Sequence, residues 1–360
     1  MGSSTSFKRL PPPQSYAYVS FPAPHVMLVV FNRPKALNAM TSAAQYDLET
    51  LFTWYDSEPS LRCAIITGAG RAFCAGMDLK EWNEVSIRRA KGEHSNGAPM
   101  PRSGFGALSR RHGKKPIIAA VNGIAFGGGM EIVSNLDLVV AAKSALFGLP
   151  EAKRGVVAMA GSLPRLARTI GRPRATELAL TGKSITAAEA REWGLINAVT
   201  EDGAADGEIL DRPVVKEALK YAASICDNSP DSVIISRAGI VAGWEDGSAE
   251  NASRLLSENW EAALNDGENI REGLLAFAEK REPRWVDSKF AVYAVKTEGG
   301  KIFSVDSVRL AGHIIGLPRR SASKSTPYEQ NRRIPTPNWH WASYHIIMTY
   351  ATGHDPFCLP

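Results

Sequence analysis

Three consecutive glycines interrupt an apolar stretch of this chain and restrict what its backbone can do. Residues 114–132 read KKPIIAAVNGIAFGGGMEI, with Glu131 two positions beyond the last glycine. Three adjacent glycines are costly in backbone entropy, so the pattern predicts a backbone that must stay free of side chains there. Bare N–H groups at a helix start stabilise a developing negative charge, and a nearby carboxylate moves protons. A second acid, Glu151, follows another short apolar run, and the combination indicates acid–base chemistry on an acyl group.

The composition is that of a globular protein with room for a sizeable core, since the 360 residues are 44% hydrophobic and 22% charged. We find no run of eighteen apolar residues, so the sequence predicts no membrane span. Residues 1–14 lack the apolar core of a secretory signal and are expected to form a flexible leader. The four cysteines are widely spaced and form no metal-binding motif, which favours reduced thiols in an intracellular compartment.

The net charge of +5 is concentrated toward the end of the chain. Residues 291–360 hold eight Lys or Arg and four Asp or Glu, so residues 1–290 are close to neutral. A basic chain often binds nucleic acid, but here the excess lies in one segment rich in Pro, Ser, Arg and Trp, with little amphipathic order. We therefore expect no nucleic-acid partner, and we expect residues 291–360 to be an atypical, disordered tail.

The hydrophobic pattern alternates between strands and helices. Short β-branched apolar runs predict strands, and a period near 3.6 after Thr41 or Ser42 predicts a helix to about Tyr55. Residues 81–115 are polar and basic, and we expect them to form a long connection. Strands separated by helices argue for an α/β fold with a helical C-terminal third. The predicted strands cover residues 25–31, 63–67, 117–121 and 137–141, and the later helices cover 213–226, 250–264 and 269–281.

Five segments carry a resemblance to a known family. They are NRPKALNAM (32–40), GRAFCAGMDLKEW (70–82), KPIIAAVNGIAFGGGMEI (115–132), FGLPE (147–151) and ALTGKSITAAEAREWGLINAV (179–199). In this order and spacing they resemble the crotonase superfamily, the enoyl-CoA hydratase/isomerase group. The resemblance spans about residues 15 to 287 and implies an α/β spiral of ββα units. It implies a spiral core with the acyl-CoA site at 15–200 and a helical trimerisation region at 201–287.

The resemblance implies an oxyanion site. Hydration of a 2-enoyl thioester places negative charge on the thioester oxygen, and two backbone N–H donors stabilise that charge by roughly 3–4 kcal/mol each. In the family the donors correspond to the N–H groups of Met77 and Gly128. A tight turn with positive φ would also explain glycine at 127–129, although one glycine would serve that purpose. Three favour a close approach of the backbone to a ligand.

Glu131 and Glu151 match the two catalytic acids of the hydratases in this family. One carboxylate would activate a water while the other delivers a proton to the α-carbon, and the sequence does not assign the two roles. Paired carboxylates in a dry pocket also raise one pKa, which keeps one group an acid. The alternative is that each is an ordinary surface glutamate. Because both stand beside apolar runs, we favour the catalytic interpretation.

The resemblance further implies a groove for coenzyme A. Lys80 would pair with a phosphate there, although a solvated lysine fits the pattern equally well. No metal and no cofactor are implied, because the acyl-CoA is itself the substrate. Met159 stands where the family usually has glycine, and a side chain there would crowd the water or the acyl chain. The expected contacts with CoA are Lys35, Ala36, Ala75, Gly76, Asp78, Leu79, Lys80 and Gly127.

Enoyl-CoA hydratase activity, the reversible syn addition of water to a 2-enoyl-CoA, is the leading hypothesis, and it would make the chain a lyase. The alternative within the fold is an isomerase that moves the double bond between C3 and C2. The alternative outside it is a non-catalytic binding protein on the same fold. Residues 11–30 and 58–68 look most like fungal members that serve fatty-acid or secondary-metabolite pathways, including those of siderophores and toxins.

The resemblance also implies a homotrimer or homohexamer, and we expect no membrane partner. Ser288, Lys289 and Phe290 resemble the tripeptide that directs proteins to the peroxisome, but that signal is read only at a free C-terminus. In this chain the tripeptide is internal. The expected compartment is therefore the peroxisome if the signal is read, and otherwise the cytoplasm.

Overall fold

Six strands form the central sheet of the computed structural model, which describes residues 7–92, 100–290, 294–296 and 302–304. Strand β1 runs antiparallel to β2, and the other neighbours run parallel. The four strands predicted from the sequence are β2, β3, β5 and β7, each within one residue of its expected start. In sheet order the strands are β1 (Ala17–Ala23), β2 (Val26–Phe31), β3 (Cys63–Gly68), β5 (Ile117–Val121), β7 (Leu138–Ala142) and β10 (Ala198–Thr200).

Three strands of the central sheet each lead into a strand of a second sheet. Its order is β4 (Ala72–Cys74), β6 (Ile124–Phe126), β8 (Leu146–Gly148) and β9 (Ser184–Thr186). Strands β3 and β4 precede helix α2 (Leu79–Ala90), β5 and β6 precede α3 (Gly128–Val133), and β7 and β8 precede the 3-10 helix η3 (Pro150–Arg154). This repeated order confirms the expected spiral of ββα units. Because β6 and β8 are parallel neighbours, α3 and η3 begin side by side.

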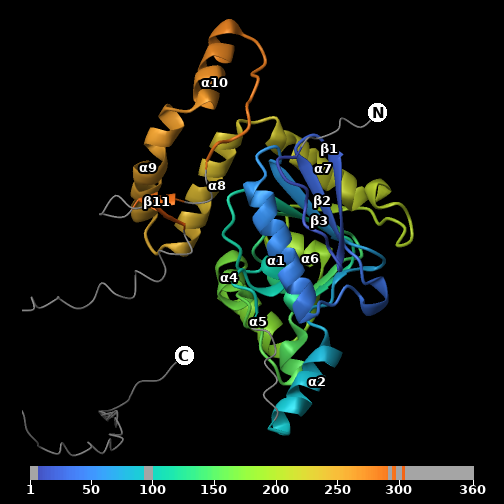
Figure 1. Cartoon of the computed structure of the whole chain (residues 1–360). Coiled ribbons are helices and arrows are strands. Elements are labelled where there is room, and N and C mark those ends of the chain that lie inside the picture. Colours follow the sequence, from blue (N-terminus) through green and yellow to red (C-terminus); the bar gives the residue numbers. More distant parts are fainter. Residues whose placement is uncertain (1–6, 93–99, 291–293, 297–301, 305–360) are drawn as a thin grey trace, which may run out of the picture. The chain divides into compact units, whose positions relative to one another are not determined.

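Both faces of the central sheet are buried, as expected for parallel strands. Met27 and Val29 of β2 belong to the core cluster that includes α1 (Ser42–Ser57), whereas the alternate residues Leu28 and Val30 pack with α7 (Pro213–Cys226). Figure 1 shows α1 and α7 on the two sides of strands β1 to β3. In β2 and β5 the alternation places every residue in one core or the other, so the middle of the sheet is a rigid support for the loops at its ends.

The helices predicted for the C-terminal third are present. Thr41, one of the two expected caps, is the N-cap of α1, and its side chain accepts the N–H of Ala44 at 3.2 Å. Helix α8 packs against α9. The remaining elements are η1 (Pro34–Ala36), η2 (Phe105–Ala107), α4 (Ser162–Thr169), α5 (Arg172–Thr181), α6 (Ala187–Glu192), η4 (Ile209–Asp211), α8 (Pro230–Glu245), α9 (Ala249–Asn265) and α10 (Glu268–Glu279). Within the described ranges, no helix has both the length and the apolar character for crossing a membrane.

Three expectations about the connections differ from the structure. Residues 81–115 are not one long loop, because they contain most of α2 and all of η2. Residues 7–14 are not a free leader, since the ring of Phe7 packs 4.5 Å from that of Phe21. In the expected tail, Ala294–Lys296 (β11) and Ile302–Ser304 (β12) form an antiparallel pair. The rest of that tail lies outside the described residues.

Candidate active site

The three glycines form the turn between β6 and α3, and each is required for a different reason. Gly127 has a φ of 54°, which L side chains rarely adopt. A Cβ atom on Gly128 would lie 2.5 Å from the ring of Phe105, and one on Gly129 would lie 2.1 Å from the carbonyl oxygen of Cys74. The backbone of Gly128 and Gly129 therefore closely approaches the protein's own atoms. The predicted approach of this backbone to a ligand stays a prediction.

The backbone amides of Met77 and Gly128 lie close together. A β-bridge pairs Met77 with Met40, and the N–H of Met40 donates to the carbonyl of Gly76 at 2.9 Å. A Cβ atom on Gly76 would lie only 3.1 Å from the nitrogen of Gly128. Among the hydrogen bonds found within the described residues, none is donated by the N–H of Met77 or of Gly128. Two neighbouring bare N–H groups are the geometry that an oxyanion site requires.

Glu131 lies on α3 and is almost completely buried. Its Oε1 atom accepts the N–H of Ala160 at 2.8 Å and the hydroxyl of Ser162 at 3.1 Å. Burial raises the pKa of the Glu131 carboxyl to about 7, and the charge of Glu151 also raises it, whereas the Ser162 hydrogen bond lowers it. At neutral pH this carboxyl is therefore able either to accept or to release a proton.

Glu151 lies in the first turn of η3 and faces the glycine turn. Its Oε1 atom is 3.2 Å from the position that a Cβ atom on Gly127 would take. Its Oε2 atom is buried and has no hydrogen-bond partner within the described residues. Burial raises the pKa of this carboxyl as well. Because a buried carboxylate oxygen without a partner is costly, the arrangement fits a site whose partner arrives with the substrate.

Met159 and Cys74, two other residues noted in the sequence, do not occupy this site. The Met159 side chain is 79% exposed, while its neighbours Ala158 and Ala160 are buried. It therefore does not fill the space between the carboxylates, and the expected crowding of the water position is not observed. Burial raises the pKa of the Cys74 thiol to about 12, which agrees with its interpretation as a small core residue.

The residues expected to contact CoA lie on two adjacent segments. The N–H of Ala75 donates to the carbonyl of Leu37 at 3.0 Å, which places Ala75 and its neighbours beside Lys35 and Ala36 of η1. Lys35 and Lys80 are both exposed, so each ammonium group is accessible to a phosphate. Leu79 is exposed at the start of α2, and Gly76 and Gly127 approach each other at the glycine turn.

Asp78 has a structural role in addition to any contact with CoA. Its carboxylate accepts the N–H of Lys80 at 3.0 Å and that of Glu81 at 3.4 Å, which caps α2. It also pairs with the guanidinium of Arg33 at 2.9 Å. A contact between Asp78 and a ligand would therefore come from its main chain or from a carboxylate lone pair that these bonds do not use.

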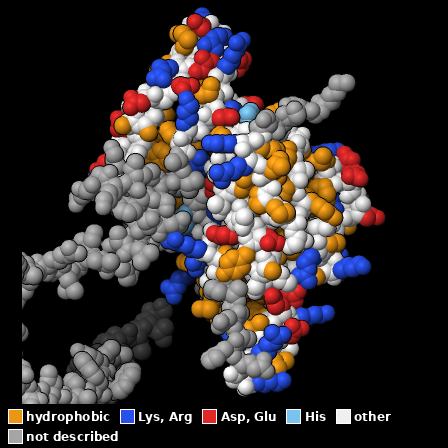
Figure 2. Space-filling view, in the orientation of Figure 1, with side chains coloured by type: hydrophobic (Ala, Val, Ile, Leu, Met, Phe, Trp, Pro, Cys, Tyr) orange, Lys and Arg blue, Asp and Glu red, His pale blue; other side chains and the backbone are white. Residues whose placement is uncertain are grey.

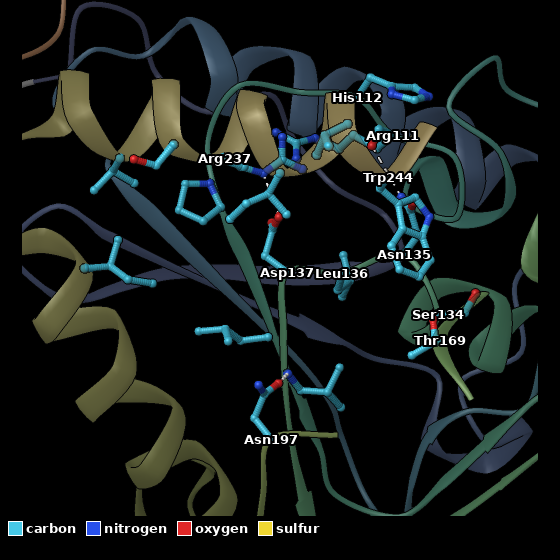
Figure 3. Close-up of a pocket in the computed structure, with 18 of the residues that line it drawn as sticks. Arg111, His112, Ser134, Asn135, Leu136, Asp137, Thr169, Asn197, Arg237 and Trp244 are labelled. Carbon is cyan, nitrogen blue, oxygen red and sulfur yellow. Dashed lines mark hydrogen bonds and ion pairs between the residues drawn. The ribbon is translucent and has the colours of Figure 1, made fainter. Parts of the chain in front are cut away.

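A separate cavity of about 890 Å³ lies beside α8 (Figure 3). Ser134 and Asp137, which follow α3, form part of one wall, and Arg237 and Trp244 of α8 form part of another. Arg237 pairs with Asp137 at 2.7 Å. No candidate catalytic or CoA-binding residue lines this cavity. Across the described parts of the chain, no group of three or more His, Cys, Asp or Glu side chains is arranged to hold a metal ion.

Comparison with known proteins decides the family. A family model described as enoyl-CoA hydratase/isomerase matches residues 23–288. The chain belongs to the enoyl-CoA hydratase/isomerase family. The resemblance to the crotonase superfamily is thereby confirmed, and so are the α/β spiral and the acyl-CoA thioester as the class of substrate.

Relatives of this family member include two fungal enzymes. The chain is 49% identical over 286 residues to mevalonyl-coenzyme A hydratase SIDH of Beauveria bassiana, covering 79% of this chain and 99% of that one. It is 47% identical to mevalonyl-coenzyme A hydratase sidH of Aspergillus fumigatus, covering 75% and 95%. The crystal structure of enoyl-CoA hydratase from Mycobacterium tuberculosis matches with a TM-score of 0.65 and 34% identity, covering 76% and 99%. The leading hypothesis, an enoyl-CoA hydratase of fungal type, agrees with the family and these relatives.

Sequence reasoning missed the residues that hold the candidate catalytic groups in place. Phe105 packs on Gly128, and Ala160 and Ser162 bind Glu131. No motif marks them, because Ser162 stands 31 positions beyond Glu131 and the Ala160 donor is a main-chain group. The one available signal is position, because residues 155–162 correspond to the loop that follows the second acid in the family, although Met159 stands there in place of a glycine.

Proposed function

We propose that this chain catalyses the reversible syn hydration of a 2-enoyl-CoA, with Glu131 and Glu151 as the pair that moves protons. The N–H groups of Met77 and Gly128 hold the thioester oxygen as it gains negative charge. One carboxylate exchanges a proton with the α-carbon, and the other exchanges a proton with the water that adds to the β-carbon. The supporting observation is a buried carboxylate, Glu131, and a partly buried one, Glu151, both with raised pKa values, beside two bare N–H donors.

Mevalonyl-CoA, consumed in the direction of dehydration, is the substrate that we propose. The support is that both fungal relatives carry the name mevalonyl-coenzyme A hydratase. Mevalonyl-CoA has a hydroxyl and a methyl group on C3, and a second hydroxyl on C5. In the reaction the C2–H and C3–O bonds break, the C2–C3 double bond forms, and the hydroxyl group leaves as water with one proton. The product is a 3-methyl-2-enoyl-CoA, a branched unit suited to siderophores and other fungal secondary metabolites.

The substrate is tested by comparing mevalonyl-CoA with unbranched 3-hydroxybutyryl-CoA. We expect kcat/KM to be at least about tenfold higher for mevalonyl-CoA. A site that binds the C3 methyl group and the C5 hydroxyl of mevalonyl-CoA loses both interactions with 3-hydroxybutyryl-CoA. The measurement is the initial rise of the enoyl thioester absorbance. Equal kcat/KM values for the two thioesters would contradict mevalonyl-CoA as the preferred substrate. Conversion of a 3-enoyl-CoA without hydration would favour the isomerase, and no reaction with any thioester would favour a binding protein.

For the CoA moiety we propose the two adjacent segments described above. The exposed ammonium groups of Lys35 and Lys80 are suited to the phosphates. The main chain of Ala75 to Gly76, with Ala36 opposite, is suited to the pantetheine arm. The reaction requires no cofactor beyond the acyl-CoA substrate.

We propose that the chain assembles as a homotrimer or homohexamer through its C-terminal helices. Helix α10 carries Leu274 and Phe277, which are 67% and 87% exposed in the single chain. Figure 2 shows hydrophobic side chains among the charged ones on this helical part of the surface. Exposed large apolar groups of this kind are typical of surfaces that another subunit covers.

Replacing both Leu274 and Phe277 with Asp tests the assembly. We expect the native mass to fall toward that of the monomer, because two charges would be buried without partners at the contact. Light scattering coupled to size exclusion provides the measurement. The control is Ala188→Asp at an exposed position in the first turn of α6, which should leave the mass unchanged. An unchanged mass for the double variant would remove α10 from the interface.

We propose that a chain ending at the tripeptide 288–290 would be directed to the peroxisome. A chain in which the tripeptide is internal is proposed to stay in the cytoplasm. In the described chain the Phe290 carbonyl accepts a hydrogen bond from the Lys114 ammonium at 2.5 Å, and its ring contacts that of Trp260 at 5.3 Å. Lys289 pairs with Glu268. These contacts hold the tripeptide against the protein, which disfavours its recognition by an import receptor.

A further inference from the structure

We propose that Ser162 is a positioning residue for Glu131, whose hydroxyl fixes the carboxylate and sets the pH range in which it carries charge. The inference rests on the proposed hydration reaction, because it takes Glu131 as a group that exchanges a proton with substrate or water. Ser162 is fully buried at the first position of α4, so its hydroxyl is available to the protein rather than to solvent.

Three donors converge on one oxygen of Glu131. The N–H of Ala160 lies 2.8 Å from Oε1, the Ser162 hydroxyl 3.1 Å, and the Ser162 N–H 3.5 Å. No hydrogen bond to the other oxygen, Oε2, is found among the described residues. The donors therefore anchor one side of the carboxylate and leave the other side for the reaction. Of the three, only the Ser162 hydroxyl belongs to a side chain, so it is the one that a substitution removes.

The turn that carries Ser162 is itself held in place. The buried hydroxyl of Ser109 donates to the carbonyl of Ala160 and accepts the N–H of Phe105, both at 2.8 Å. Phe105 in turn packs on Gly128, whose N–H is a proposed oxyanion donor. The anchor of the carboxylate and the oxyanion donor therefore share one frame. Because this turn is held in place, the Ser162 hydroxyl keeps one orientation, and its hydrogen bond to Glu131 is maintained.

The groups around the Glu131 carboxyl explain why this hydroxyl matters. Burial and the negative charge of Glu151 on η3 both raise its pKa, which with all neighbouring groups included is about 7. The Ser162 hydroxyl is the largest opposing influence, followed by the N–H groups of Ser162 and Ala160. No cation is among the described groups that act on it. Arg165, also on α4, donates to Asn135 at 2.7 Å and pairs with Glu245 at 3.2 Å.

The test is the pH profile of kcat/KM for Ser162→Ala. Removing a hydrogen bond to the charged form raises the pKa of Glu131, so the limb of the profile that reports Glu131 is expected to move up by about one pH unit. If Glu131 acts as the base, the acidic limb moves, and activity below it falls by about tenfold but recovers at higher pH. If Glu131 acts as the acid, the alkaline limb moves instead. Either shift supports the proposal and also assigns the role of Glu131.

Ser134→Ala is the matched control. The Ser134 hydroxyl also bonds to Glu131, at 2.8 Å, but it donates to the main-chain carbonyl, and Ser134 lies in the wall of the cavity shown in Figure 3. This variant should leave both limbs in place. Ser162→Thr keeps the hydroxyl and should restore the wild-type profile. Melting temperatures of the three variants show whether each one folds.

A titration that does not depend on turnover separates this inference from the proposed function. The side-chain carboxyls of ¹³C-labelled glutamate are followed by NMR, and Glu131→Gln assigns the Glu131 signal. We expect this signal to titrate about one pH unit higher in Ser162→Ala than in wild type. If wild type turns over enoyl-CoA but Ser162→Ala moves neither the limb nor the signal, the proposal is overturned. It is equally overturned if Ser134→Ala produces the same shift. Absence of wild-type turnover would instead reject the proposed function.

Discussion

Replacing Glu131 with Gln is expected to lower kcat for enoyl-CoA hydration by roughly 10²–10⁴-fold, and Glu151→Gln is expected to have an effect of similar size. Gln has the same shape, and its amide oxygen still accepts the hydrogen bonds from Ala160 and Ser162. The loss therefore reports proton transfer rather than misfolding. The measurement is the initial change in enoyl absorbance with crotonyl-CoA, together with the melting temperature of each variant.

Two further variants show whether the glutamates act as a pair. Because hydration needs both protons to move, the double variant is expected to lose little more activity than the worse single variant. Glu192→Gln is the control, since Glu192 is an exposed glutamate 3.9 Å from Arg174 and should retain activity within about twofold. A single variant at either site that keeps more than a tenth of the wild-type rate would exclude that residue as an acid or base.

Replacing Gly128 with Ala is expected to lower kcat by about 10²-fold or more, although no charged or polar side chain is changed. The new Cβ atom would lie 2.5 Å from the ring of Phe105, so either the ring or the backbone of the turn must move. Moving the backbone misdirects the Gly128 N–H away from the thioester oxygen. Overpacking of this kind also destabilises the fold by about 1–3 kcal/mol. Steady-state kinetics and thermal unfolding measure the two effects separately.

The double variant Gly128→Ala with Phe105→Ala identifies the cause of that loss. Removing the ring relieves the contact, so at least a tenfold recovery of kcat relative to Gly128→Ala is expected. Gly243→Ala is the control glycine, because a Cβ atom there meets nothing within 4 Å and its helix, α8, gains about 0.5–1 kcal/mol of stability. Wild-type kcat in Gly128→Ala would contradict this prediction, because it would mean that the ring of Phe105 moves while the backbone of the turn stays in place.

Most of the fold follows from local patterns in the sequence. Residues 117–121 are entirely apolar and form β5, and the predicted helix at 213–226 coincides with α7. Helix α2 was missed, because seven of its twelve residues are polar or charged and none of the twelve packs into a core. The contacts of residues 7–14 were missed for a related reason. The ring of Phe7 packs against Trp54, 47 positions away, and no local pattern announces such a partner.

The candidate site divides in the same way. By itself the sequence determined the glycine turn and the two acids, because positive φ at Gly127 and carboxylates beside apolar runs are local properties. Only the tertiary structure decided that α3 and η3 lie side by side through the parallel pairing of β6 and β8. It also decided which donors hold Glu131, since all three come from a distant turn and two of them are main-chain N–H groups. The raised pKa of Glu131 has the same origin, because burial is a property of the whole packed fold rather than of its neighbours in the chain.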